Sequence, residues 1–277
     1  MKNTSDEAYI SMWDEFAERK ASQYLDNKYD LNNIVGLVGR AREHEALRLL
    51  AFTENDTFLD VGCASGHQVF VAAKKVKRAV GIDVGKEFIA VAKRHADEIK
   101  AQNVEFQLTD GSIPFPDHSF TKLLCSEVVE HLVDPYPLLA EIKRVLVPGG
   151  TVVFTVPNLN SRGTLWKRLL YGFKEPPFTP LTDFSAEAIK AHGGDAHVVQ
   201  FTLARFRALI ESAEFSVDYV GGAGYIDGPK MGRIIELTNR LPFFQWLTFS
   251  IEKICARISL FKALSRQIIL RGYAPQK

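Results

Sequence analysis

The sequence predicts an α/β protein with a doubly wound, mostly parallel sheet that is preceded by helices. From Thr57 onward, short runs typical of buried strands alternate with longer helical patterns. Strands that alternate with helices at this rhythm indicate a parallel sheet with helices on both faces. In addition, the first three strand-like runs each end in or beside an aspartate, namely Asp60, Asp83 and Asp110.

The elements are expected in the following order. Up to about Leu50, apolar residues recur at three- and four-residue spacing, which predicts helices. Asp134 and Pro135 are typical of the start of a helix. Strands are expected at 57–62, 78–83, 103–110, 119–126, 151–157, 216–222 and 268–274, with helices ending near 77 and spanning 86–101, 135–146 and 201–215.

This order predicts two parts. Residues 1–50 would form an N-terminal helical cap, and residues 51–277 would form the α/β domain. Within that domain, two segments at about 158–198 and 222–265 are expected to be insertions. No internal repeat and no low-complexity tract is found.

The composition is that of a soluble globular protein: 277 residues, 46% hydrophobic, 24% charged, with a net charge of +1. The balanced charge argues against nucleic acid as a partner. Three widely spaced cysteines without a CxxC pair predict free thiols in a reducing cytoplasm. The polar first residues do not have the pattern of a signal peptide, and no apolar stretch is long enough to span a bilayer.

The loop after the first strand has the features of a nucleotide site. In the stretch LDVGCASGH, Asp60, Gly62 and Gly66 follow a strand and open a helix, where backbone N–H groups can approach an anion. Asp83, at the end of the second strand, is placed to accept hydrogen bonds from a ribose diol. Aspartates also cap helices and begin turns. Three of them in register favour the nucleotide interpretation.

Four motifs in this order resemble class I S-adenosylmethionine-dependent methyltransferases: LDVGCASG, GIDVGKEFIAVAK, LTDGSIPFPDHSFTKLL and EIKRVLVPGGTVVFTVPN. The match covers roughly residues 57–158. It implies a Rossmann-like, seven-stranded sheet whose last strand is antiparallel, and S-adenosylmethionine as the cofactor. Ala64 departs from the family, which often has glycine there. The implied cofactor residues are Asp60, Gly62, Ala64 and Gly66 at the methionine moiety, Asp83 at the ribose, and Asp110, Gly111 and Ser112 at the adenine.

The stretch SEVVEHL after the fourth strand is a candidate catalytic segment. If it forms a helical turn, Glu127, Glu130 and His131 share one face. Together with His197, they would offer oxygen and nitrogen ligands to a divalent metal such as Mg²⁺ or Mn²⁺. The segment resembles the E-x-x-E-H motif of quinone-biosynthesis O-methyltransferases and of small-RNA 2′-O-methyltransferases, which use such a metal.

The same residues also fit a site without metal. Acidic residues are favoured in the first turn of a helix by its dipole. Many methyltransferases that need no metal resemble this chain here, with the histidine bonded to the edge of the sheet. In that case, Glu130 or His131 could still act as a general base.

Two segments near the expected acceptor mouth are basic and aromatic. Residues 226–271 carry eight Lys and Arg against Asp227, Glu236 and Glu252, and the loop after residue 157 also has a surplus of cations. One interpretation is a helical lid with its aromatic side chains packed inward. The other is an anionic or lipid-linked acceptor, or docking on a membrane surface.

The sequence therefore predicts a methyltransferase that methylates a hydroxyl of a small or lipid-linked molecule. The alternatives are a metal-free N- or C-methyltransferase and, from another class, a non-catalytic protein that binds the cofactor. The three intact aspartates argue against the last. The sequence does not indicate the identity of the acceptor or the oligomeric state.

Overall fold

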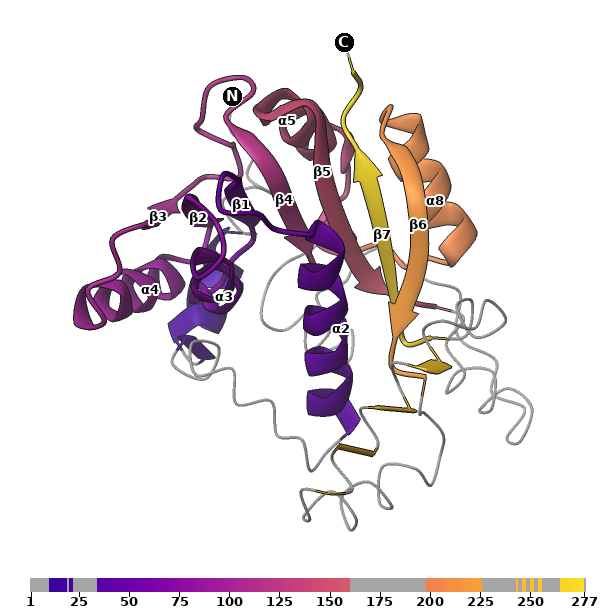
Figure 1. Ribbon diagram of the computed structural model, residues 1–277, viewed down its shortest axis with the longest axis horizontal. Helices are drawn as coiled ribbons and strands as arrows, with labels where there is room; N and C mark the ends of the chain where they lie inside the picture. Colours follow the sequence, from indigo (N-terminus) through magenta and orange to yellow (C-terminus); the bar gives the residue numbers. More distant parts are fainter. Residues whose placement is uncertain are drawn as a thin grey trace.

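The computed structural model has one seven-stranded sheet with helices on both faces (Figure 1). It describes residues 10–18, 20–21, 34–159, 198–225 and 265–276, and residues 243, 246–247, 250–251 and 254–255. The predicted insertion at 158–198 lies almost entirely outside these residues, and most of the insertion at 222–265 does too. The division into a cap at 1–50 and a domain at 51–277 stays a prediction.

The strand order is β3-β2-β1-β4-β5-β7-β6. The first five strands run parallel, whereas β7 is antiparallel to both β5 and β6. This arrangement confirms the predicted doubly wound, Rossmann-like sheet with an antiparallel last strand. The strands are β1 (Thr57–Val61), β2 (Arg78–Asp83), β3 (Val104–Leu108), β4 (Phe120–Ser126), β5 (Leu146–Pro157), β6 (Ser216–Ala223) and β7 (Gln267–Tyr273).

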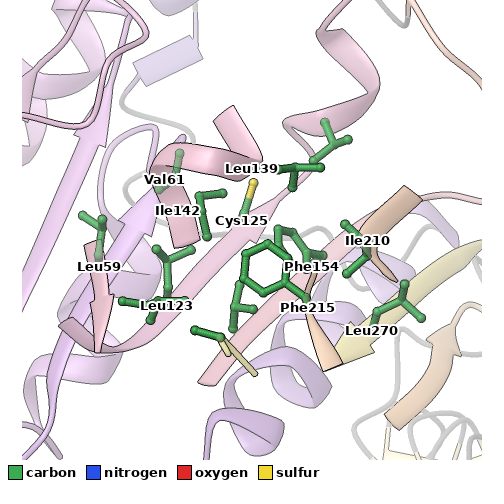
Figure 2. Packing of buried hydrophobic residues seen from close by; sticks show 14 of the residues in the cluster. Leu59, Val61, Leu123, Cys125, Leu139, Ile142, Phe154, Ile210, Phe215 and Leu270 are labelled. Atoms are coloured by element: carbon green, nitrogen blue, oxygen red, sulfur yellow. The ribbon is translucent and has the colours of Figure 1, made fainter. Parts of the chain in front are cut away.

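The helices cover the two faces of the sheet because successive strand residues point to opposite sides. On one face, α5 (Tyr136–Val145) and α8 (Leu203–Ser212) pack against side chains such as Leu123 and Phe154 (Figure 2). On the other face, buried side chains of α2 (Ile34–Leu50), α3 (His67–Ala73) and α4 (Lys86–Glu98) meet Phe58 and Leu124. Both faces of the central strands are therefore buried, as expected of a parallel sheet.

Several boundaries differ from the prediction, and β5 in particular begins at Leu146 and not at residue 151. Strand β3 ends at Leu108, so Asp110 lies in the following turn and not in the strand. The helical turn considered for the segment after β4 is a 3₁₀ turn limited to Val129–His131. None of the described helices is long and apolar enough to cross a membrane.

Candidate active site

The three predicted aspartates lie along the carboxyl edge of neighbouring strands. Asp60 lies within β1 next to its end, Asp83 is the last residue of β2, and Asp110 follows β3 by two residues. Asp60 pairs in register with Gly81, and Asp83 pairs with Leu108. The parallel pairing of β1, β2 and β3 therefore brings the three loops to one edge, which is where doubly wound sheets bind their ligands.

The loop between β1 and α3 needs glycine at two positions. Gly62 and Gly66 have φ values of +74° and +83°. A Cβ at Gly62 would lie 2.4 Å from Cγ2 of Val128, and one at Gly66 would lie 2.4 Å from the ring of Phe106. Larger residues are therefore excluded both by the backbone conformation and by space. The loop is a narrow backbone cradle of the kind that the sequence predicted for the cofactor.

Ala64 occupies the middle position of this loop with a φ of +46°. This left-handed conformation is costly for a residue that has a Cβ. The amide of Ala64 donates a hydrogen bond to Oδ2 of Asp83 at 2.8 Å. The position that departs from the family therefore keeps the backbone conformation of a glycine, with some strain.

Asp83 is held by backbone donors from two loops. Its Oδ2 accepts from Ala64, and its Oδ1 accepts from the amide of Gly85 at 2.8 Å. Burial raises the pKa of Asp83 to about 6, although hydrogen bonds from Gly85, Ala64 and Val84 act in the opposite direction. Both carboxylate oxygens are thus fixed in place at the end of β2, where the resemblance places the ribose.

Asp60 is a deeply buried carboxyl with an unsatisfied oxygen. The residue is 2% exposed, and its Oδ2 has no hydrogen-bond partner among the described residues. Burial raises its pKa well above the usual range, and the negative charges of Asp83 and Glu43 add to this. Such a group is costly unless a ligand satisfies it. The cradle and this unsatisfied oxygen fit a cationic ligand such as S-adenosylmethionine.

The predicted adenine end is more open. Asp110, Gly111 and Ser112 are all exposed. Oδ1 of Asp110 accepts a hydrogen bond from the hydroxyl of Ser112 at 2.8 Å. Gly111 has a φ of +99°, and a Cβ added there would have no neighbour within 4 Å. Here glycine is favoured by the turn conformation alone.

On the acceptor side, Glu130 and His131 lie together and are buried. They are 1% and 8% exposed, and Nε2 of His131 lies 3.9 Å from Oε1 of Glu130. The ring of Trp13 meets the imidazole edge-on at a centroid distance of 5.0 Å. The carbonyl of Glu130 accepts hydrogen bonds from the amides of Val198 and Val199, which fixes the turn from a distant part of the chain. A buried imidazole beside a carboxylate can accept a proton.

Glu127 does not join them. It precedes the 3₁₀ turn and has a φ of +59°, so the predicted common helical face is wrong. Its carboxylate lies 2.8 Å from Nη1 of Arg42 and also accepts from Thr155 and Gln267 at 3.2 Å.

The predicted metal ligands are therefore not assembled among the described residues, where no three His, Cys, Asp or Glu side chains gather closely enough to hold a metal ion. The fourth predicted ligand, His197, lies outside those residues. A guanidinium cation already neutralises Glu127, so the described residues do not fit the predicted metal site.

Sequence reasoning missed the residues that reach this edge from the first fifty positions. Arg42 and Glu43 are both largely buried on α2. Asp14 accepts from the amide of Lys86, and the carbonyl of Ala21 accepts from the hydroxyl of Ser65. In the sequence, these residues are marked only as charged positions inside an otherwise apolar helical stretch. That pattern does not indicate which loops of the sheet they contact.

The sequence of the chain is similar to the sequences of known methyltransferases. A sequence model of the family described as "Methyltransferase domain" matches residues 59–154. Aklanonic acid methyltransferase DauC of Streptomyces sp. (strain C5) is 32% identical over 171 residues, which are 60% of this chain and 73% of that protein. The chain belongs to the class I S-adenosylmethionine-dependent methyltransferase family. Its methyl donor is therefore S-adenosylmethionine, and it is an enzyme.

Two further comparisons agree with this family assignment. Ubiquinone biosynthesis O-methyltransferase of Vibrio cholerae is 31% identical over 109 residues, which are 39% of this methyltransferase and 44% of that protein. This chain thus spans less than half the length of that relative. The crystal structure of YcgJ from Bacillus subtilis aligns with a TM-score of 0.55 at 16% identity, over 85% of this chain and 98% of that one. This likeness supports the fold.

Proposed function

We propose that the enzyme methylates a hydroxyl group of a small or lipid-linked acceptor, with His131 as the general base. The observation that carries this proposal is the buried pair of Glu130 and His131 beside the cofactor loops. Bound S-adenosylmethionine supplies an electrophilic methyl group on a sulfonium. A hydroxyl loses its proton when it accepts that methyl group, so a base at this position has a clear use.

Each residue of this pair would have a distinct task. His131 takes the proton of the acceptor hydroxyl, and the neighbouring carboxylate of Glu130 stabilises the imidazolium that forms. Trp13 packs against the imidazole and limits its orientation. The surrounding buried residues restrict the access of water, which favours transfer to the bound acceptor over side reactions. The acceptor must also be aligned with the methyl group. Residues on the acceptor side of the carboxyl edge of the sheet would provide this alignment.

The cofactor residues would act as the resemblance implies. Asp83 would accept hydrogen bonds from the ribose diol, and Asp110 would contact the adenine. Asp60 and the loop of Gly62, Ala64 and Gly66 would hold the methionine moiety. The orientation of Asp83 by two backbone donors supports its role, because a fixed acceptor loses less freedom on binding.

Names among the proteins similar to this chain include both oxygen and carbon as the accepting atom, because one of the solved structures is a geranyl diphosphate C-methyltransferase. The Vibrio cholerae relative is called an O-methyltransferase of ubiquinone biosynthesis. N- or C-methylation without a metal is the alternative. An amine that is already neutral needs no base to attack the methyl group, so it would make less use of His131.

The direct test is a screen with ¹³C-methyl-labelled S-adenosylmethionine against quinone precursors, other phenols, amines and lipid extracts. The carbon chemical shift of the product reports whether the methyl group is bonded to oxygen, nitrogen or carbon. We expect a methoxy product, formed equally well in excess chelator after verified removal of metals. A product methylated at carbon or nitrogen would contradict the proposal, and a loss of turnover that added Mg²⁺ or Mn²⁺ restores would reinstate the metal.

We also propose peripheral contact with an anionic membrane through residues 243–254. Phe243, Trp246, Leu247, Ile251 and Ile254 recur at helical spacing and are between 36% and 64% exposed. The surrounding segment 226–271 carries a net charge of +5. Exposed apolar side chains within a basic segment are typical of helices that lie in the membrane interface.

Vesicle co-sedimentation tests this contact. The enzyme should pellet with vesicles that contain phosphatidylglycerol, less with pure phosphatidylcholine, and less at high salt. Trp246→Glu should reduce the pelleted fraction, whereas the matched surface change Val133→Glu should not. Absence from both pellets, or binding that Trp246→Glu leaves unchanged, would contradict the proposal.

A further inference from the structure

Helix α2 brings a third carboxylate, Glu43, to the cofactor side of the carboxyl edge. Glu43 is 9% exposed, and its Oε1 lies 2.9 Å from Nε2 of His67. His67 is the first residue of α3 and directly follows Gly66 of the glycine loop. Glu43 is also close enough to Asp60 to raise the pKa of that carboxyl. Residues from α2, β1 and α3 therefore meet beside the loop that the resemblance assigns to the methionine moiety.

The unsatisfied group in this arrangement is the carboxyl of Asp60. Glu43 and Asp60 are both more than nine-tenths buried, and their like charges oppose each other. His67 is close to Glu43, but Oδ2 of Asp60 has no hydrogen-bond partner among the described residues. Buried carboxylates of this kind are costly unless a cation neutralises them and donates hydrogen bonds. A ligand with N–H donors and a positive charge would satisfy both requirements.

S-adenosylmethionine offers two cationic groups of different chemistry. Its sulfonium has a positive charge but no N–H, so it can interact with a carboxylate only through charge. Its α-ammonium group has three N–H donors and can bind two carboxylates at once. The adenosine portion has no positive charge. The unsatisfied oxygen of Asp60 therefore favours the ammonium group.

We propose that Glu43 binds the α-ammonium group of S-adenosylmethionine together with Asp60. His67 is a positioning residue, because its contact with Glu43 holds that carboxylate next to the glycine loop. The inference rests on the cofactor alone and holds for any acceptor. It adds a cofactor residue from α2, outside the segment 59–154 that matches the family.

Three ligands distinguish this role from the alternatives. S-adenosylmethionine has both cations, S-adenosylhomocysteine keeps the ammonium but has a neutral sulfur, and 5′-methylthioadenosine has neither. Calorimetry on Glu43→Gln should show weaker binding of the first two ligands, by about tenfold or more, as expected for a lost charge-assisted hydrogen bond. Binding of 5′-methylthioadenosine should stay within about twofold of the wild-type value, a change too small to represent such a bond.

A matched control lies two residues away on the same helix. Glu45 accepts hydrogen bonds from Arg48 and Tyr219 and does not contact His67 in the described structure. Glu45→Gln should affect all three ligands equally or not at all. If Glu43→Gln does not fold, Glu43→Asp keeps the charge on a shorter side chain and should show the same ligand pattern with a smaller loss.

Three outcomes would overturn the assignment. An equal loss for all three ligands would show a structural role for Glu43. A loss confined to S-adenosylmethionine would place the carboxylate at the sulfonium. Unchanged binding of every ligand would remove Glu43 from the site. Failure of the O-methylation proposal would instead appear in the labelled product and would leave this ligand pattern unchanged.

Discussion

The two halves of the carboxyl edge are built in different ways. On the cofactor side, backbone amides of the loops that follow β1 and β2 hold the side chain of Asp83, because Ala64 and Gly85 donate to its two carboxylate oxygens. On the acceptor side, the contacts come from distant parts of the chain. Trp13 packs on His131, and Arg42 on α2 binds Glu127. The cofactor half is therefore held mainly by backbone donors of two neighbouring loops, with further contacts from Asp14, Ala21 and Glu43. The acceptor half is held mainly by side chains from distant elements.

This difference suggests a division of labour. Backbone contacts within short loops leave little room for side-chain variation, which suits a cofactor that does not change. Side-chain contacts between distant elements can vary without disturbing the sheet, which suits a variable acceptor. Helix α2 connects the halves, because Arg42 reaches Glu127 while the adjacent Glu43 reaches His67. Substitutions on one side should therefore leave the properties of the other side largely unchanged.

The largest effect is expected on the acceptor side. His131→Ala should lower kcat by about 10²- to 10⁴-fold, the usual contribution of a general base. Steady-state rates with saturating cofactor measure this loss. His95→Ala, a change on α4 away from the acceptor side, is the control and should leave kcat nearly unchanged. A His131→Ala enzyme with wild-type turnover would remove the base from the acceptor half.

A smaller effect concerns the stability of the ligand-free protein. The folded-state pKa of Asp83 is raised to about 6, so between about pH 4 and pH 6 the folded state binds more protons at this group than the unfolded state does. The stability contributed by Asp83 is thus present below about pH 4 and lost as pH rises through 6. Its size is on the order of 3 kcal/mol at most.

Denaturant unfolding of the wild type and of Asp83→Asn at several pH values between 4 and 7 isolates this contribution. As pH rises from 4 to 7, the wild type should lose stability relative to Asp83→Asn, because only the wild type has to ionise this buried carboxyl. The comparison is needed because carboxyls with lowered pKa, such as Asp56 and Asp218, give the opposite slope. Parallel curves for the two proteins would contradict the buried, locally bonded description of Asp83.

The smallest effect is expected within the glycine loop. Ala64→Gly should relieve the strain of a left-handed alanine and change the free energy of unfolding by less than about 1 kcal/mol, in the stabilising direction. Thermal unfolding measures the change. Lys100→Gly, at another left-handed position with a φ of +52°, should stabilise similarly without altering cofactor affinity. Clear destabilisation by Ala64→Gly would show that the methyl group of Ala64 contributes packing that outweighs its strain.

The same contrast explains how much the sequence could predict. The strands, their order along the chain and the loop of Asp60, Gly62 and Gly66 follow from local patterns, and the structure has them with shifted boundaries at β3 and β5. The expected helical face of Glu127 and Glu130 was wrong, because the left-handed backbone at Glu127 and its contact with Arg42 are not encoded in local spacing. The positions of Trp13 and Glu43 likewise depend on tertiary packing.

The most direct test of the separation is calorimetric titration of S-adenosylmethionine into the wild type, Asp83→Ala and His131→Ala. Loss of a charged hydrogen-bond acceptor should weaken binding to Asp83→Ala by about tenfold or more. Binding to His131→Ala should stay within about twofold, because its contacts lie on the acceptor side. Unchanged affinity in Asp83→Ala, or an equal loss in both variants, would contradict the account of two separable halves.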